Sequence, residues 1–460
     1  MPFIGREKEL NLLEERYRSS KAEFFVLYGR RRVGKTELLK QFSQGKPVIF
    51  YTAGQTEAQD NLNQLTERCQ EFFQDSMPRG MTFKTVEGVL EYLVEKAQGE
   101  KLVVILDEFQ YLVNADQSIP SLMQRFWDHK GRHANLMLVL CGSSISLMVD
   151  YALAEKSPLY GRRTGQLQLK PFDFRTAGEF FPDWSYQDKL LTYGALGGIP
   201  AYLNQFDPSI SFEDNITRHI LRKDTFLGEE AEFLLKTELR DIKSYTSILK
   251  AIAAGNTTLK DLTSKVSHTA TSISSYLSNL QTLHLVAREV SLAERAPEKS
   301  KKGRYTIQDN FLNFWFRFVE PNMTLVEFGQ EKALYQEKIQ PALSQYMGYV
   351  FEAICQQYVL LYWQEAGLPI PRRIGKVWDK DYDLDVVAEG IDGSYLFGEC
   401  KWSNKPVDPG IVHLLKERAE KSGLETQKAQ YVLFSSGGFQ TKVKSDKAVK
   451  LVSTEELFGK

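Results

Sequence analysis

The stretch Tyr28–Leu39, "YGRRRVGKTELL", decides the fold of the N-terminal part of the chain. Gly29 to Thr36 have the pattern GxxxxGK[ST], and the apolar run Phe24–Tyr28 comes directly before them. A continuous apolar run is typical of a buried parallel strand, and "ELLKQF" after Thr36 predicts a helix. Strand, glycine-rich loop and helix in this order place backbone N–H groups and a helix N-terminus around phosphate groups. The pattern therefore predicts a nucleotide site.

The residues of this loop have separate predicted roles. Lys35 is expected to reach the β- and γ-phosphates of ATP, and the Thr36 hydroxyl to ligate Mg²⁺. A glycine-rich turn that binds nothing is the alternative, and the strand before and helix after the loop argue against it. The residues expected to bind the nucleotide are Gly29, Arg30, Arg31, Arg32, Val33, Gly34, Lys35 and Thr36.

A second signal is "KLVVILDEFQYL", in which the apolar strand Leu102–Leu106 ends at Asp107 and Glu108. Asp107 is placed to hold Mg²⁺ through water, and Glu108 to polarise the water that attacks ATP; two solvated carboxylates at a strand end are the alternative. Ser143, after another buried strand, is a candidate sensor of the γ-phosphate or an ordinary turn residue. Strands that alternate with helical patterns predict a parallel, doubly wound sheet.

Two later features could complete a nucleotide site. "SPLYGRRTG" places Arg162 and Arg163 before the last strand, where either could serve as an arginine finger for its own chain or for a neighbour. A solvated surface pair is the alternative. "ALGGIPAYL" could press Pro200 against adenine, or could simply break a helix.

The segments FIGREKEL, GRRRVGKT, LVVILDEFQYL, SPLYGRR and LGGIP resemble those of the archaeal-type P-loop ATPases. These are relatives of the AAA+ and STAND ATPases, in which an ATPase core is followed by a winged helix and a C-terminal nuclease-like domain. The resemblance implies an ATP site, a helical lid that carries Gly198 and Pro200, and a homo-oligomer.

From about Tyr245 the sequence predicts three helices and a two-stranded wing, with the spacing of a winged helix-turn-helix. Leu and Ile residues mark the buried face of the third helix, whose exposed face carries Ser, Thr and Asn. DNA contacts are therefore expected at the wing, and a packing module that relays the ATPase state is the alternative. The wing residues expected to contact phosphates are Lys299, Lys301, Lys302 and Arg304.

Near the C-terminus, "YDLDVVAEGIDGSYLFGECKW" (Tyr382–Trp402) carries acidic residues inside two segments of strand length. Side chains alternate along a strand, so Glu399 and Lys401 share a face, and Asp385 on the neighbouring strand can meet that face. Two carboxylates can hold Mg²⁺, with Mn²⁺ as an alternative. Lys401 would then orient a nucleophile or stabilise a transition state.

The order helix, three strands, helix, strand resembles the PD-(D/E)xK nuclease fold. Asp385, Glu399 and Lys401 match its D…ExK pattern, and Glu352 matches the helix glutamate that many members add, so Glu352, Asp385 and Glu399 are the predicted metal ligands. Leu384 replaces the proline of the pattern, and Asp383 is an alternative ligand. A fold that keeps these charges for structure or signalling is the alternative.

Arg372, Arg373 and Lys376 form a basic stretch where a DNA backbone could lie. The whole chain of 460 residues has 58 Lys and Arg against 59 Asp and Glu, so any nucleic-acid binding must come from such local patches. Four cysteines without CxxC spacing argue against a zinc ribbon or disulfide framework and favour the cytoplasm. No apolar run approaches the about 18 residues of a membrane helix.

Together these patterns predict an α/β protein with a P-loop NTPase parallel sheet and helical lid, then a winged helix-turn-helix, then an α/β restriction-endonuclease-like domain. The predicted boundaries are 1–172, 173–240, 241–310 and 311–460. We expect an ATP-hydrolysing protein that acts on DNA, with a metal-dependent nuclease domain under ATPase control. The alternatives are a STAND-like switch that binds partners or DNA without cleaving, and a DNA-binding regulator with slow ATP turnover as a timer.

Overall fold

The computed structural model describes residues 3–74, 83–97, 99–239, 241–294, 296–365 and 367–459. The chain divides into two compact units, residues 1–171 and 172–460. Each unit contains a five-stranded sheet, and the second unit also contains a two-stranded hairpin.

The sheet of the first unit has the order β2-β3-β4-β1-β5, and every neighbouring pair is parallel, which confirms the predicted parallel sheet. Because β4 lies between β1 and β3, the carboxyl ends of these three strands meet at one edge. The strands are β1 (Glu23–Tyr28), β2 (Val48–Thr52), β3 (Leu102–Asp107), β4 (Leu136–Gly142) and β5 (Gly165–Gln168).

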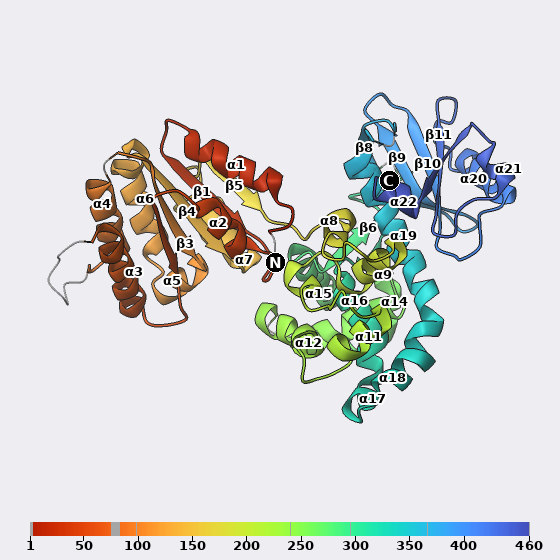
Figure 1. Ribbon diagram of the computed structural model, residues 1–460, viewed down its shortest axis with the longest axis horizontal. Helices are drawn as coiled ribbons and strands as arrows, with labels where there is room; N and C mark the ends of the chain where they lie inside the picture. Colours follow the sequence, from red (N-terminus) through yellow and green to blue (C-terminus); the bar gives the residue numbers. More distant parts are fainter. Residues whose placement is uncertain are drawn as a thin grey trace. The chain divides into compact units, whose positions relative to one another are not determined.

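Helices cover both faces of this sheet, since β3 and β4 are buried along their whole length. Side chains of α3 to α6 form one apolar cluster with β1 to β4, and Figure 1 shows α3, α4 and α6 together beside the sheet. The helices are α1 (Glu7–Arg18), α2 (Lys35–Ser43), α3 (Ala58–Phe73), α4 (Val86–Lys96), α5 (Phe109–Ala115), α6 (Ile119–His129) and α7 (Ile145–Met148), with short turns at Gly131–His133 and Val149–Leu153.

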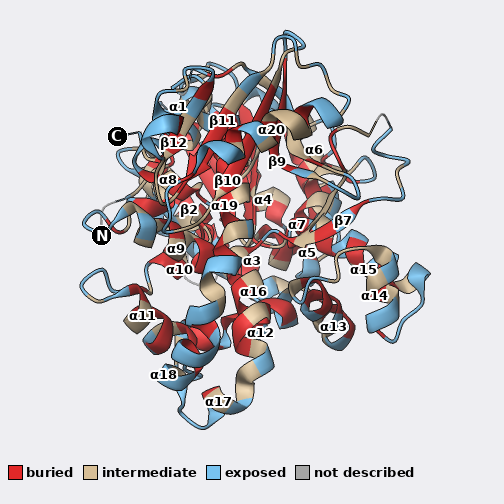
Figure 2. Ribbon diagram, turned by 90° about the vertical axis from the view of Figure 1, so that its right-hand side faces the viewer, coloured by how far each residue is buried: buried red, intermediate tan, exposed pale blue. Residues whose placement is uncertain are grey.

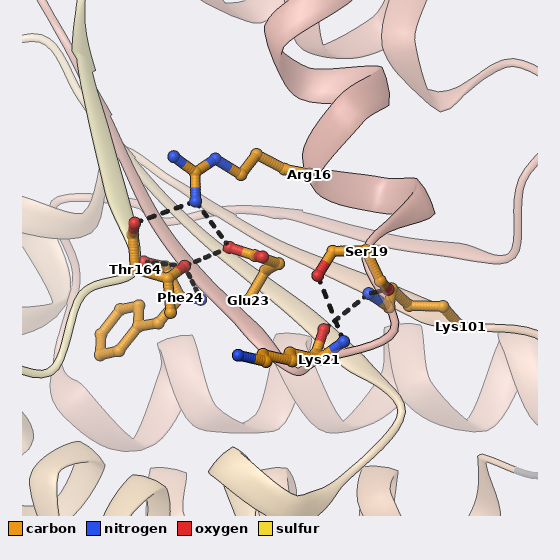
Figure 3. A network of polar contacts seen from close by, with 7 residues as sticks. All are labelled: Arg16, Ser19, Lys21, Glu23, Phe24, Lys101 and Thr164. Atoms are coloured by element: carbon orange, nitrogen blue, oxygen red, sulfur yellow. Dashed lines mark hydrogen bonds and ion pairs between the residues drawn. The ribbon is translucent and has the colours of Figure 1, made fainter.

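Polar contacts fix the amino edge of this sheet (Figure 3). The buried Glu23 accepts a hydrogen bond from the Thr164 hydroxyl, and Arg16 of α1 lies 3.5 Å from the same carboxylate and donates to the Thr164 carbonyl at 3.1 Å. Lys101, just before β3, donates to two carbonyl oxygens of the α1–β1 connection. These contacts tie β1, β3 and β5 to α1.

The second unit begins with helices and the hairpin. Ile273, Leu277, Leu280 and Leu283 are buried, as predicted for the third helix of the three-helix segment. The helices are α8 (Phe174–Gly178), α9 (Tyr186–Leu196), α10 (Pro200–Leu203), α11 (Phe212–Asn215), α12 (Phe226–Glu238), α13 (Ile242–Ala253), α14 (Leu259–Lys265) and α15 (Ala270–Thr282), with a π-helical turn at Ile216–Ile220; the antiparallel hairpin is β6 (Val286–Glu289) and β7 (Arg304–Ile307).

A helical connection leads to the second sheet, whose order is β12-β11-β10-β9-β8. Neighbours from β8 to β10 are antiparallel and those from β10 to β12 are parallel. The central strand β10 is buried (Figure 2). The connection contains α16 (Asn310–Phe314), Trp315–Val319, Glu320–Asn322, α17 (Met323–Glu327), α18 (Glu331–Leu334) and Tyr335–Ile339; then follow α19 (Gln340–Tyr362), β8 (Pro371–Trp378), β9 (Asp383–Gly390), β10 (Tyr395–Lys401), α20 (Pro409–Lys421), β11 (Gln430–Ser435), α21 (Thr441–Lys444), β12 (Val449–Ser453) and α22 (Thr454–Leu457).

The predicted order of helix, three strands, helix and strand is present from α19 to β11, whereas β12 and α22 were not predicted. None of the helices in the described ranges combines the length and apolarity that crossing a membrane requires.

Segments that were predicted as separate domains pack together within residues 172–460. After β6, the Leu292 N–H donates to the Lys376 carbonyl of β8 at 2.8 Å. The Tyr346 hydroxyl of α19 donates to the Gly194 carbonyl of α9 at 2.7 Å, and Phe458 stacks on Tyr186. Residues 172–460 form one compact unit. The boundaries at 240 and 310 lie inside this unit and stay predictions.

Gly198 generates the first testable prediction. A Cβ at this position would lie 1.9 Å from the Phe172 carbonyl oxygen, and the Gly198 carbonyl accepts the Phe172 N–H at 2.8 Å. We expect Gly198→Ala to lower the free energy of unfolding by about 1–3 kcal/mol, measured by thermal unfolding. Gly348→Ala is the control, because nothing lies within 4 Å of its Cβ position on helix α19. Equal melting temperatures for the two variants would contradict the predicted clash.

Candidate functional site

The glycine-rich loop between β1 and α2 has a backbone conformation that requires glycine at two positions. A Cβ on Gly29 would lie 2.4 Å from the Leu169 carbonyl oxygen, and Gly34 has φ 95°. The buried Lys35 ammonium donates to the carbonyl oxygens of Gly29 and Arg30, each at 2.8 Å. The lysine charge is therefore held inside the loop, where the pattern predicts phosphates.

Two arginines hold this loop in place, Arg6 from outside it and Arg31 from within it. Arg6, in the segment FIGREKEL, donates through Nη2 to the carbonyl oxygens of Val33 at 3.0 Å and Lys170 at 2.8 Å. Arg31 donates to the Tyr111 hydroxyl of α5 at 2.8 Å. The sequence assigns Arg6 no separate role, because its contact with Val33 depends on tertiary structure.

Thr36 and Asp107 meet as the sequence predicted. The Thr36 hydroxyl donates to Asp107 Oδ2 at 2.9 Å, and Asp107 Oδ1 accepts the Glu108 backbone N–H at 3.0 Å. Asp107 is only 2% exposed. A hydroxyl and a carboxylate side by side are the oxygen donors that Mg²⁺ prefers, so this pair fits a magnesium ion bound with nucleotide phosphates.

Glu108 lies next to this pair, at the start of α5, with φ 53°. Its Oε2 accepts from the Ser143 hydroxyl at 2.6 Å, from the Ser143 N–H at 3.4 Å, and from the Gln110 amide. Ser143, the candidate γ-phosphate sensor, is thus bound to Glu108. The contact between Gln110 and Glu108 was not predicted. The signal in the sequence was a polar residue two positions after Glu108, in "DEFQ".

The backbone of the predicted arginine fingers lies at the other edge of the sheet. Gly165, the first residue of β5, pairs with Phe25 near the start of β1, so the backbone of residues 162 and 163 is at the amino edge. Arg162 binds Asp128 through Nε and Nη2 at 2.8–3.1 Å, and Arg163 donates to carbonyl oxygens at 3.3 and 3.5 Å. Their role as fingers stays a prediction, as does the contact of Pro200, the first residue of α10, with adenine.

The second site lies where β9 and β10 pair. Gly398 is opposite Val386, so one step further Asp385 and Glu399 face each other across the antiparallel strands. Asp385 is 9% exposed and Glu399 3%. Asp385 Oδ2 accepts the Cys400 N–H at 2.9 Å, and Lys401 donates to Glu399 Oε1 at 2.7 Å. The predicted convergence of these three side chains is therefore present.

Arg418 of α20 joins this site, and the sequence analysis missed it. Its Nη1 lies 3.3 and 3.4 Å from the two Glu399 carboxylate oxygens and 3.2 Å from the Asp383 carbonyl. Its signal was faint: a cation between the buried helix residues Leu415 and Ala419. Glu399 is thus bound by two cations.

Glu352, the third predicted metal ligand, has a cationic partner. It pairs with Lys376 of β8, and within the described ranges no group of three or more His, Cys, Asp or Glu residues is arranged to hold a metal ion. Glu352 as a third metal ligand stays a prediction, and Lys376 would compete with a metal ion for its carboxylate. Asp385 and Glu399 fit a magnesium ion held by two carboxylates and water, an arrangement common for Mg²⁺.

Comparison with known proteins places the chain. Residues 3–206 match the family described as "ATPase domain predominantly from Archaea", and residues 315–421 match "Archaea bacterial proteins of unknown function". An uncharacterized protein of Methanocaldococcus jannaschii is 33% identical over 441 residues, 94% of this chain and 95% of that protein. This chain belongs to the archaeal P-loop ATPase family.

One further relative and one solved structure are similar to this chain. An uncharacterized ATP-binding protein of Pyrococcus abyssi is 27% identical over 224 residues, 44% of this chain and 68% of that protein. A solved Walker-type ATPase of Pyrococcus abyssi has a TM-score of 0.51 and 22% identity, over 68% of this chain and 96% of that chain. The solved structure supports the fold, and the family supports ATP binding and hydrolysis.

Four of the six residues predicted to bind DNA in this P-loop ATPase have protein partners. Arg372 and Arg373 both pair with the buried Glu389. Near the hairpin of β6 and β7, Lys302 lies 3.3 Å from Glu294, and the Arg304 guanidinium lies 4.6 Å from the centroid of the Trp378 ring. Lys299 and Lys301 are exposed. DNA contact by these six residues stays a prediction.

Burial makes the second site of the P-loop ATPase sensitive to pH. Burial raises the pKa of Asp385 to about 7, and the charges of Glu352 and Glu399 add to this shift against the Cys400 N–H and Lys401. Burial also raises the pKa of Glu352, which Lys376 opposes. Ionised Asp385 is therefore disfavoured in the folded chain.

Asp385→Asn tests this electrostatic penalty. Between pH 4 and pH 7 the unfolded chain releases the Asp385 proton while the folded chain keeps it, so wild-type stability falls as pH rises through this window. Asparagine carries no such proton. We expect a stability gain near zero at pH 4 that grows to about 2–4 kcal/mol at pH 8, measured by denaturant unfolding in EDTA.

Asp392→Asn is the matched control. Asp392 lies in the exposed β9–β10 turn, where hydrogen bonds from Ser394 lower its pKa. Its contribution is lost as pH falls, so this variant is expected to lose stability at high pH. A gain for Asp385→Asn that does not change with pH would contradict the raised pKa.

Proposed function

We propose that this chain is an ATP-controlled enzyme that acts on DNA, with a metal-dependent nuclease site at Asp385, Glu399 and Lys401. One observation carries the proposal: Asp385 accepts the backbone N–H of Cys400, the residue between Glu399 and Lys401, whose side chains pair with each other, in a chain of the P-loop ATPase family. An ATPase core gives such a site a means of control.

In the first unit, the loop from Gly29 to Thr36 binds the phosphates of ATP. Lys35 balances their charge, and Thr36 with Asp107 would hold Mg²⁺, which neutralises the β- and γ-phosphate oxygens when bound. Glu108 polarises the attacking water. The water oxygen bonds to the γ-phosphorus as the bond to the bridging oxygen breaks, and self-association in ATP would bring Arg162 or Arg163 to a neighbouring chain's site.

In the second unit, Asp385 and Glu399 would hold Mg²⁺ or Mn²⁺, which acidifies a water and offsets phosphodiester charge when bound. Lys401 orients the nucleophile or stabilises the added negative charge. The exposed Lys299 and Lys301 at the β6–β7 wing supply positive charge for the DNA backbone, as do Arg372 and Arg373 where Glu389 leaves their charge uncompensated. The three helices before this hairpin suit a winged helix.

A second candidate is a signalling switch whose C-terminal part binds DNA or a protein partner without cleaving. The ion pairs of two carboxylates at this site favour it: Glu352 with Lys376, and Glu399 with Lys401 and Arg418. Such pairs stabilise a fold in the absence of any reaction.

Lys35→Ala tests the nucleotide site. Loss of its charge-assisted contact is expected to weaken ATP binding about 100-fold, measured by calorimetry. Lys40→Ala is the control, since Lys40 lies on the same helix, is exposed and pairs with Glu37 at 2.8 Å. Unchanged ATP affinity in Lys35→Ala would overturn the assignment of the loop.

Glu399→Gln tests the nuclease site. Linear, circular, single-stranded and branched DNA are incubated with the full chain in Mg²⁺ or Mn²⁺, with and without ATP. We expect cleavage that falls at least about 100-fold in the variant, because the amide is a poor ligand for a hard cation. Glu417→Gln is the control, because Glu417 pairs with Lys421 on α20 outside the site. Cleavage by neither wild type nor variant would favour the second candidate.

A further inference from the structure

Gln110 is a buried polar residue for which the sequence analysis proposed no role. It is 1% exposed and lies on the first turn of α5. Its Nε2 donates to Glu108 Oε2 and also to the Ser143 hydroxyl at 3.3 Å, and that hydroxyl donates to the same Glu108 oxygen at 2.6 Å. Glu108, Gln110 and Ser143 thus form a closed ring of three hydrogen bonds.

The other end of the amide is left unsatisfied. Gln110 Oε1 is buried and has no hydrogen-bond partner among the described residues. Exchanging the amide nitrogen and oxygen would place oxygen against the Glu108 carboxylate, so the donor must face Glu108. A Cβ on Gly142 would lie 2.6 Å from Oε1, so a glycine provides the space that this orientation needs.

This orientation does not serve stability. A buried carbonyl without a donor costs about 1–3 kcal/mol, and an apolar side chain of similar shape would remove that cost. Buried polar groups in such a state call for an explanation, and a catalytic role is one of those known. The position of Glu108 supplies one.

All three donors bind one oxygen of Glu108. Oε2 accepts from Gln110 and from both the hydroxyl and the N–H of Ser143, whereas Oε1 accepts from no described residue. Glu108 as a whole is partly exposed. One oxygen of the carboxylate is therefore fixed, and the other is left for a ligand that brings its own proton, such as water.

We propose that Gln110 is a positioning residue for ATP hydrolysis, which with Ser143 fixes Glu108 so that Oε1 faces the attacking water. Gln110 acts through Glu108 and touches neither ATP nor the water. The inference rests on the proposed role of Glu108. It concerns only the orientation of Glu108, whereas nucleotide binding depends on Lys35 and the loop backbone.

The test is Gln110→Leu in the full chain. We expect kcat for ATP hydrolysis to fall about 10- to 100-fold, because a positioned general base contributes about 10²–10⁴-fold, while calorimetry finds ATP affinity within twofold of wild type. The melting temperature should stay equal or rise, since the unsatisfied carbonyl is gone. Gln59→Leu is the control: Gln59 is exposed on α3, where it bonds Asn63, and its replacement should leave kcat unchanged.

Ser143→Ala and the double variant extend the test. If both side chains act by fixing the same oxygen, their effects on kcat should be less than multiplicative. Fully multiplicative effects would overturn the shared role.

Three other outcomes would overturn the inference. An unchanged or raised kcat in Gln110→Leu would show that the amide does not position Glu108 productively. A fall in kcat that is matched by lower stability and weaker ATP binding would show a merely structural residue. If the wild type binds ATP and hydrolyses none, the hydrolytic role of Glu108 fails together with the inference, whereas wild-type hydrolysis beside an unaffected variant removes the inference alone.

Discussion

A carboxylate removed from water needs donors or cations around it, and both candidate sites depend on this constraint. Asp107 and Glu399 are 2% and 3% exposed. Thr36 and the Glu108 N–H satisfy the first, and Lys401 and Arg418 satisfy the second. Helices α2 and α20 must therefore stay close to the strands that carry Asp107 and Glu399. The partners on these helices and strands explain why acidic residues can lie inside strand sequences.

Helix α19 connects segments of residues 172–460 that lie far apart in the sequence. The Tyr346 hydroxyl donates to the Gly194 carbonyl, and the Gln357 side chain accepts the Phe174 N–H at 3.0 Å. Between them on the same helix, Glu352 pairs with Lys376 of β8. This 23-residue helix thus contacts the predicted lid segment through Tyr346 and Gln357, and it carries Glu352, whose charge acts on Asp385.

Local patterns predicted the nucleotide loop and the meeting of Asp385 with Glu399, because both follow from short-range rules. Strand, loop and helix in order define the first, and the two-residue period of neighbouring strands defines the second. Arg418 could not be predicted in this way, since its contact requires the angle at which α20 crosses β9 and β10. The hydrogen bond from Leu292 to β8 likewise depends on packing between segments far apart in sequence.

The carboxylates of the two sites have different kinds of partners. Around Asp107 and Glu108 the nearest donors are hydroxyl, amide and backbone N–H groups, which orient a carboxylate and leave its charge in place. Around Glu399 and Glu352 the nearest partners are ammonium and guanidinium groups, which cancel the charge. A cation is attracted to the first arrangement even before a nucleotide adds its own negative charge. At the second, the protein's own cations Lys401 and Arg418 would compete with a metal ion for Glu399.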